Sequence, residues 1–333
     1  MLADRTIGLT DKKSEEIETN LIDKVDRILE NHYRNGVKVK TLDLDLFGYN
    51  NINASYLDRW LHISVKSGIE VLNLIMYPFM DDSYYSFPSS VLSDTAAASS
   101  IQSIFLMYCA FRPTSTLGCL KRLKSLDLSR VRINDEGLGH LLSKCFALER
   151  LVVNGCTGII FLRIPCTLQQ LKLLHITTCE TMQNVDTPML SSKLINLKKL
   201  EIGLCASVQA VSPSYDVFSL LSFLDASPAL DSFLLCVEQD ALTHDPVVGD
   251  DEKYPRRKPK CWHNSLRQVT ITGFCSAKSL VDLTVHILEG TSSLERLTLD
   301  TVPSYGRYIA GRVPSGVEFQ VLEPCGRCHS GNP

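Results

Sequence analysis

The sequence lacks any run of about 18 apolar residues, the length that a membrane-spanning helix requires, so no such helix is expected. It also lacks an excess of basic residues, because its formal net charge at pH 7 is −3. A surface without positive charge has little attraction for nucleic acid or an anionic membrane. The polar N-terminus "MLADRTIGLTDKKSEEIE" has no apolar core of the kind found in signal peptides. We therefore expect neither nucleic acid nor a membrane as a partner.

Motifs of catalysis are missing as well. The chain has no Gly-Lys-Ser/Thr phosphate loop, no nucleophile elbow and no metalloprotease helix. Its eight histidines are scattered along the sequence. We therefore predict a protein that is not an enzyme and that has no cofactor, and an enzyme with an unrecognised site is the last of three alternatives.

The 12 cysteines do not have the pattern of a small disulfide-rich domain, because the chain is long and several of them lie inside apolar runs. Buried free thiols in a reducing compartment fit better, which predicts a location in the nucleus or cytoplasm.

The tail "EPCGRCHSG" places Cys325, Cys328 and His329 at the spacing of haem attachment or of half a zinc site. Haem attachment belongs to oxidising compartments. A zinc site would need further ligands, for which Cys261 and His263 are the candidates. We favour a structural or disordered tail and predict no metal site.

The most informative pattern is a repeat that places apolar residues at its first, fourth and sixth places. "LERLVVNGC" at 148–156, "LKLLHITTC" at 171–179 and "LKKLEIGLC" at 197–205 share it, and each has cysteine at the ninth place. Copies of this triplet recur at spacings of 22 to 36 residues. They start at residues 39, 69, 101, 123, 148, 171, 197, 230, 266 and 294.

This pattern is the leucine-rich-repeat signature. The fourth and sixth residues point to one face of a short strand, because side chains alternate along a strand. A single unit cannot bury that face alone, whereas stacked units share a continuous core. The sequence therefore predicts an α/β leucine-rich-repeat solenoid, a curved horseshoe of about ten irregular repeats with a parallel concave sheet and helices on the convex side. The ninth-place cysteines, Cys109, Cys156, Cys179 and Cys205, are expected to be structural, not redox-active or metal-binding.

Between the strands, helical periodicity predicts returning helices, for example within "INDEGLGHLLSKC" and "SAKSLVDLTVHILEG". Residues 14–34 form one amphipathic helix with a stripe of Ile17, Leu21, Val25, Ile28 and Leu29, and Gly36 stops it. Its expected role is to cap the first repeat, with partner binding as the alternative. The predicted organisation is a capping segment at 1–36, repeats at 37–302 and a C-terminal cap and tail at 303–333.

Residues 238–263 interrupt the rhythm and are predicted to be a mobile surface loop. Their basic run could also act as a nuclear import signal. It contains Arg256, Arg257, Lys258 and Lys260.

The odd places of each strand line the concave face of such a solenoid. In the middle copies they mix bulky apolar groups with charged ones, a combination typical of surfaces that bind proteins. An entirely solvated face would be more uniformly polar. The candidate binding residues are Phe105, Met107, Asp127, Arg150, Val152, Asn154, Leu173, His175, Lys199, Glu201 and Arg296.

Almost the whole chain resembles the leucine-rich-repeat portion of plant F-box/LRR proteins, the MIF-type family. The resemblance rests on "KVDRILENH" (24–32), "YLDRWLHISVKSGIEVLNL" (56–74), the segment 100–156, the segment 269–301 and "GRVPSGVEFQVLEPCGRCH" (311–329). It implies that full-length members dock on a Skp-type adaptor of an SCF ubiquitin ligase through an N-terminal F-box. Their repeats would then hold the protein to be ubiquitinated. It implies no catalytic residue.

The F-box of that family is a helical module that usually opens near a Leu-Pro pair. No segment ahead of residue 39 resembles it. We therefore expect an adaptor to bind only a longer form that contains the module. The leading hypothesis is the substrate-recognition portion of an F-box protein, and the alternative is a stand-alone repeat scaffold without a ubiquitin role.

Overall fold

A computed structural model describes most of the chain, in two compact units, Met1–Phe146 and Ala147–Pro333. The described residues are 4–36, 39–46, 49, 52–77, 84–159, 161–165, 167–177, 184–186, 194–204, 217–238, 263–275, 277–301 and 303–323.

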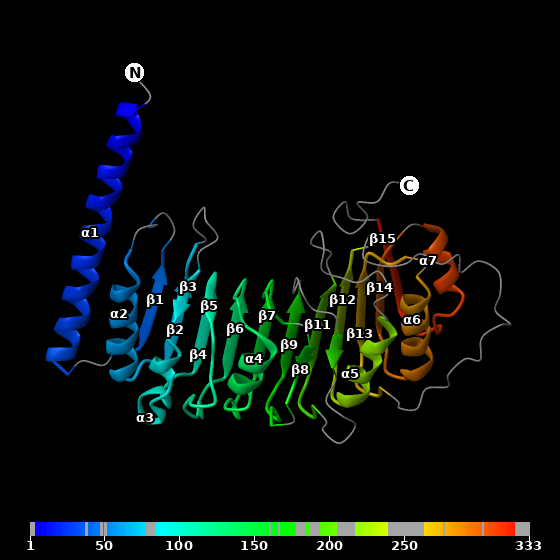
Figure 1. Cartoon of the computed structure of the whole chain (residues 1–333). Coiled ribbons are helices and arrows are strands. Elements are labelled where there is room, and N and C mark those ends of the chain that lie inside the picture. The colour runs from blue at the N-terminus through cyan, green and yellow to red at the C-terminus, as the bar shows by residue number, and fades with distance from the viewer. Residues whose placement is uncertain are drawn as a thin grey trace. The chain divides into compact units, whose positions relative to one another are not determined.

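The first unit has a parallel sheet in the order β1-β2-β4-β6 and a short pair formed by β3 and β5 (Figure 1). Its elements are α1 (Asp4–Arg34), β1 (Thr41–Asp45), α2 (Ala54–Lys66), β2 (Val71–Ile75), β3 (Tyr85–Phe87), the 3-10 helix η1 (Ser89–Leu92), α3 (Thr95–Ala98), β4 (Ser103–Met107), β5 (Cys109–Phe111), β6 (Ser125–Ser129) and α4 (Asp135–Leu142).

The second unit has a parallel sheet in the order β7-β9-β11-β12-β13-β14-β15 and a short parallel pair formed by β8 and β10. Its elements are β7 (Arg150–Asn154), β8 (Phe161–Arg163), β9 (Leu173–Thr177), β10 (Asn184–Asp186), β11 (Lys199–Leu204), η2 (Val217–Leu220), α5 (Leu221–Ala226), β12 (Ser232–Val237), β13 (Gln268–Thr272), α6 (Lys278–Gly290), β14 (Arg296–Asp300), α7 (Pro303–Ala310) and β15 (Glu318–Leu322).

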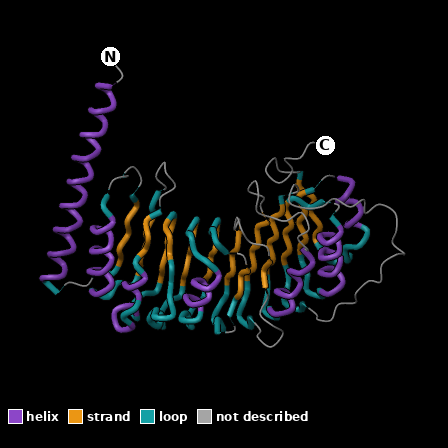
Figure 2. Tube along the Cα trace, viewed as in Figure 1, coloured by secondary structure: helices purple, strands orange, loops and turns teal. Residues whose placement is uncertain are grey.

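The predicted α/β leucine-rich-repeat solenoid is confirmed. Each of the ten predicted copies has a strand that begins at its third place. Within each unit the strands pair in step, so that equal places lie opposite one another, as Leu151 does with Leu174. The even places of the strands point into the core, and Leu151 and Leu174 are both 0% exposed. Figure 2 shows the strands of each unit side by side with helices along one face.

An eleventh repeat was missed. β15 adds a parallel strand beyond β14, with Arg296 opposite Glu318, so the sheet of the second unit continues past the predicted boundary at residue 302. In this register Gly316 occupies the first place, where the other copies have a large apolar residue. Phe319 at the fourth place is half-buried, and Val321 at the sixth is 42% exposed. Because this strand buries little apolar surface, its sequence lacks the full apolar triplet by which the other copies were recognised.

The turn after several strands depends on a left-handed residue at the eighth place. Its φ is 55° at Tyr108, 52° at Arg130, 61° at Gly155 and 73° at Gly273. This conformation directs the ninth residue inward, where side chains of very different size are buried. They are Cys109, Val131, Cys156 and Phe274. The expectation that the ninth-place cysteines are buried holds for Cys109 and Cys156, although Phe274 shows that a small side chain is not required.

The helices bury the faces that their periodicity predicted. Leu138, Leu141 and Leu142 of α4 are buried, as are the apolar residues of α6. The first turn of α4 is capped by Asn134, whose side chain accepts a hydrogen bond of 2.9 Å from the backbone N–H of Gly137. Capping of this kind is worth about 1 kcal/mol.

The N-terminal helix α1 is longer than predicted, and its contact face agrees with the predicted stripe only in part. Leu29 is buried and Leu21 and Val25 are half-buried, whereas Ile28 is 46% exposed and Glu18 is buried. The helix packs against α2, where the carboxylate of Asp26 forms an ion pair with Arg59 and accepts a 2.7 Å hydrogen bond from the indole of Trp60. The polar contact fixes which side of α1 faces the repeats. Gly36 ends this segment with φ 62°, as a stop requires.

Several predictions fall on residues outside the described ranges. They concern Cys179, Cys205, the body of the loop at 239–262, and the tail with Cys325, Cys328 and His329. The free cysteines among the described residues are Cys109, Cys119, Cys145, Cys156, Cys236 and Cys275.

The buried ladder predicts a large difference between two leucine truncations in the second unit. Leu151→Ala removes a side chain that is 0% exposed and should lower the free energy of unfolding by about 2–5 kcal/mol. Leu322→Ala removes one that is 49% exposed and should cost about 0.5 kcal/mol or less. Urea titrations of the two variants measure both values, and equal losses would show that the register is wrong.

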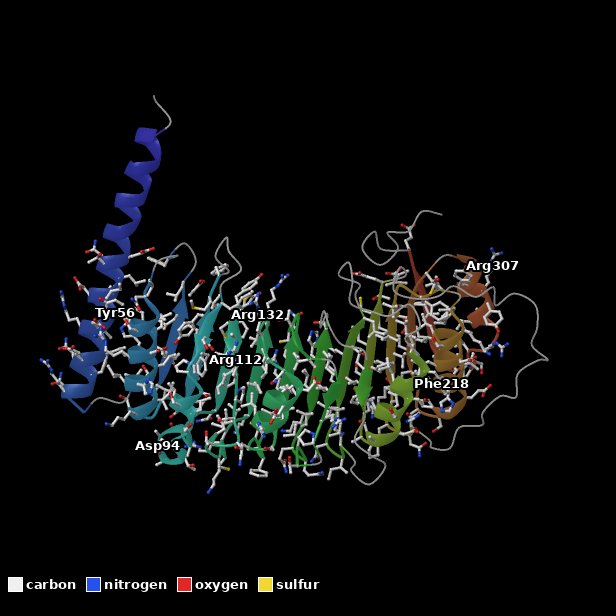
Figure 3. All side chains as sticks on the ribbon, in the orientation of Figure 1. Tyr56, Asp94, Arg112, Arg132, Phe218 and Arg307 are labelled. Carbon is white, nitrogen blue, oxygen red and sulfur yellow. The ribbon has the colours of Figure 1, made fainter. Side chains whose placement is uncertain are left out.

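Two histidines are buried in the helical layer of the second unit. His263 and His286 are each 6% exposed, and neither Nε2 atom has a hydrogen-bond partner among the described residues. The ring of His286 meets that of Phe218 edge-on, with centroids 5.7 Å apart. Phe218 is labelled in Figure 3. Burial lowers the pKa of both histidines below the ordinary value, and the nearby carboxylate of Asp225 only partly opposes it.

These lowered pKa values predict that acid destabilises the protein. The unfolded chain takes up protons on both histidines near the ordinary pKa of about 6.5, whereas the folded chain takes them up only at lower pH. The stability is therefore complete above about pH 6.5 and falls as the pH decreases through the lowered values. Urea midpoints at about pH 7.5 and 5.5 should differ more for the wild type than for His286→Leu. The control His62→Gln, which removes an exposed histidine, should show the same difference in urea midpoint as the wild type. If His286→Leu also shows the full wild-type difference, His286 does not cause the acid destabilisation.

Candidate protein-binding face

The odd places of the strands in the second unit form three rows, because the register is the same from strand to strand. The third places bring Arg150, Leu173 and Lys199 next to one another, and the fifth places do the same for Val152, His175 and Glu201. The seventh-place row begins with Asn154, Thr177 and Gly203. Seven of the predicted binding residues thus lie on three adjacent strands.

Glu201 is the centre of a hydrogen-bonded group on this face. One carboxylate oxygen lies 2.6 Å from Nζ of Lys199, and the other lies 2.5 Å from Nδ1 of His175. The side chain of Glu201 is 17% exposed, that of His175 28% and that of Lys199 47%. Burial opposes the ionisation of Glu201, but the hydrogen bonds from Lys199 and His175 outweigh it and hold its pKa below the ordinary value. The carboxylate therefore keeps its negative charge at neutral pH.

A second polar contact continues the group toward the carboxyl ends of the strands. The hydroxyl of Thr177 donates a 2.7 Å hydrogen bond to Oδ1 of Asn154, and it lies 3.5 Å from Nε2 of His175. Polar side chains that bond one another keep fixed positions, so this face presents a defined pattern of charge to a partner. We call Asn154, His175, Thr177, Lys199 and Glu201 the polar row.

Gly203 allows the strands to hold Thr177 in this position. A Cβ atom at Gly203 would lie 2.6 Å from Cγ2 and 3.1 Å from Cβ of Thr177, closer than such atoms approach one another. The glycine is therefore required by the close contact and not by its own backbone angles.

Apolar side chains flank the polar row. Leu173 and Leu234 are half-buried on the same face. Val152 lies at an outward place as predicted, but it is only 6% exposed. Its neighbours cover this side chain, and His175 is the residue opposite it on β9.

The remaining predicted residues lie elsewhere. Phe105, Met107 and Asp127 are half-buried on the odd face of the first unit, where Asp127 accepts a 3.1 Å hydrogen bond from Ser129. Arg296 forms an ion pair of 2.9 Å with Glu318 of β15. This ion pair was not predicted from the sequence, because β15 itself was not predicted. Thr177 and Gly203 were also not chosen from the sequence, and their small size offered no signal of a role.

The described residues contain no group of three or more His, Cys, Asp or Glu side chains placed to hold a metal ion. Within the same ranges, no helix has the length and apolar character needed to cross a membrane.

These features define a leucine-rich-repeat protein with charged and apolar side chains on the odd-place face of its second unit. The family profile described as the LRR domain of At1g61320/AtMIF1 matches residues 28–187 and 181–307. The chain belongs to this family.

A curated relative, the Arabidopsis thaliana F-box protein At5g03100, is 23% identical over 119 residues, which are 36% of this chain and 36% of the relative. The match thus spans about a third of the length of that relative. A solved structure, the Leptospira interrogans LRR protein LIC12759, covers 89% of this chain and 81% of its own at 14% identity and a TM-score of 0.38. That likeness is too low to bear on function.

The contact between Gly203 and Thr177 predicts a coupled pair of substitutions. Gly203→Ala alone should cost about 1–3 kcal/mol of stability, because the added methyl group collides with Cγ2 of Thr177. Thr177→Ser removes that methyl group and keeps the hydroxyl that bonds Asn154. The double variant should therefore be more stable than the sum of the single losses by about 1 kcal/mol. Urea titrations of the four proteins in the cycle test this, and strictly additive losses would exclude the contact.

Proposed function

We propose that this chain binds a protein through the odd-place face of its second unit and that it serves as the substrate-recognition part of an SCF-type F-box protein. The polar row is the observation that carries the proposal. It holds the charges of Lys199 and Glu201, and the half-buried apolar side chains of Leu173 and Leu234 lie beside it. Apolar anchors supply affinity in protein interfaces, and charges choose the partner.

The leucine-rich-repeat domain itself is a protein-interaction domain, since solenoids of this kind offer long, regular surfaces for binding. A role in ubiquitination draws its support from the F-box relative in Arabidopsis thaliana. In such a role an F-box in a longer form would hold the Skp-type adaptor, and the repeats would hold the protein to be ubiquitinated. The chain would act by binding, without catalysing a reaction itself.

A stand-alone scaffold is the second candidate, because the binding face requires no ubiquitin ligase. Purification of the endogenous protein separates the two. Recovery together with a Skp-type adaptor and a cullin supports the receptor, and recovery of a partner without either supports the scaffold. The free cysteines of the described residues favour a reducing compartment, so we propose the nucleus or cytoplasm as the location.

An exchange of charges on the binding face should abolish partner binding while the fold is kept. The variant carries Arg150→Glu, Lys199→Glu and Glu201→Lys, so that positions 199 and 201 still hold opposite charges. Partners recovered with the tagged wild-type chain should bind this variant roughly tenfold or more weakly, because charge pairs across an interface become repulsive. Titration of the purified partner measures the affinity.

The matched control exchanges another ion pair of the same unit. Lys172 and Glu149 lie 2.8 Å apart, and both occupy second places, off the binding face. Lys172→Glu with Glu149→Lys should leave the affinity unchanged. If the control weakens binding as much as the face variant, or if neither does, the partner binds elsewhere on the chain.

A further inference from the structure

Two arginines of the first unit are held on tyrosine rings at the exits of neighbouring strands. The guanidinium carbon of Arg130 lies 5.4 Å from the ring centroid of Tyr108, and that of Arg132 lies 3.9 Å from the centroid of Tyr84. Tyr108 stacks in turn on Tyr77, with centroids 6.1 Å apart and ring planes 28° apart. Arg130 and Arg132 are exposed, and Arg132 can be found in Figure 3. We call the two arginines with Tyr84 and Tyr108 the arginine rim.

The backbone sets the places of both arginines. The backbone N–H of Tyr108 donates to the carbonyl of Ser129 at 3.1 Å, which ties the exit of β4 to the end of β6. The backbone N–H of Arg132 donates a 2.9 Å hydrogen bond to the carbonyl of Cys109. The carbonyl of Arg132 accepts another, also of 2.9 Å, from the backbone N–H of Phe111. Between the arginines, Val131 is buried and anchors the segment. Hydrogen bonds of the backbone therefore hold Tyr108 and Arg132 of the rim in place.

The guanidinium groups of the rim keep their hydrogen-bond donors available. Neither Arg130 nor Arg132 forms an ion pair or a side-chain hydrogen bond within the described part of the chain. Other stacked arginines differ in this respect. Arg59 also lies over a tyrosine, but Asp26 pairs with it, and Arg312 donates a 3.1 Å hydrogen bond to Tyr308. A guanidinium stacked by its face on a ring still presents its edge, which is the part that binds a carboxylate through two parallel bonds.

The left-handed backbone at this place gives independent support. Two other left-handed eighth places carry glycine, at Gly155 and Gly273, whereas the rim has Tyr108 and Arg130 with φ 55° and 52°. A side chain in this conformation is strained, and glycine is not. The strain is accepted at the two places whose side chains stack on each other, which indicates that those side chains themselves are needed.

We propose that the arginine rim binds an acidic segment of a protein, whose carboxylates pair with the free edges of Arg130 and Arg132. A carboxylate-bearing chain fits because the rim offers two positive charges on flat aromatic supports, and no carboxylate of the described residues pairs with either. The proposal goes beyond the face described above, since it rests on residues of the first unit alone.

The test uses the whole chain and a short fluorescein-labelled peptide of glutamate and glycine, with a glutamine and glycine peptide as its neutral counterpart. Fluorescence anisotropy should show binding of the glutamate peptide at low ionic strength and weaker binding as salt is added, because salt screens exposed charges. Arg130→Gln with Arg132→Gln should weaken binding roughly tenfold or more, which corresponds to about 1.4 kcal/mol. Lys121→Gln with Arg122→Gln removes the same charge from exposed residues of the same unit and should have little effect.

Two further variants separate stacked arginines from general positive charge. Tyr84→Leu keeps both arginines but removes a ring, and it should weaken binding of the peptide. Arg130→Gly relieves the left-handed strain, so it should keep or raise the melting temperature while it weakens binding. The second result would show that a loss of affinity does not come from a loss of folding.

The proposal is overturned if the glutamate peptide does not bind, if the glutamine peptide binds equally well, or if the Lys121 and Arg122 variant loses as much affinity as the rim variant. Binding of a phosphoserine peptide without binding of the glutamate peptide overturns it as well. The peptide assay involves no residue of the polar row. The proposed function can therefore fail while the rim still binds, and the rim can fail while a partner still needs Lys199 and Glu201.

Discussion

The structure depends on the burial of apolar side chains at the first, fourth and sixth places of the ten predicted repeats. One repeat cannot bury them, because a single strand and its return have only one apolar side. Neighbouring strands bury them together, and the best packing is reached when equal places lie opposite each other, as Leu151 and Leu174 do. That register fixes the opposite face at the same time. Lys199, Glu201 and His175 meet because the leucines beside them must meet.

The sequence predicted the ten copies well, because each has large apolar residues at all three places and the burial that results is strong. It failed at β15, where Gly316 stands at the first place and the strand is largely exposed. It also failed to predict the left-handed turns at Tyr108 and Arg130, since only glycine signals such a backbone from sequence. The contact face of α1 was predicted only in part for a different reason: Asp26 bonds Trp60, and hydrophobicity alone cannot represent that polar contact.

The candidate binding face was likewise predicted in part and missed in part. Alternation along the strands predicts which side chains lie on the face, and the register predicts which ones are neighbours. Burial does not follow from alternation, since Val152 points to this face and is still covered. The bonds of Glu201 to two donors, and the position of Thr177 against Gly203, depend on rotamers and on atomic spacing. Such details lie beyond any repeat pattern.

The strict register has a consequence for how this chain can change during evolution. The copies start 22 to 36 residues apart, so the return segments tolerate insertions and deletions of many residues. Within a strand, one inserted or deleted residue would exchange the two faces and place charged side chains in the core. Length variation among relatives should therefore occur between the strands, while the residues within each strand change only by substitution. The surface of such a protein can change quickly, because its exposed odd places accept new side chains without disturbing the leucines that hold the stack together.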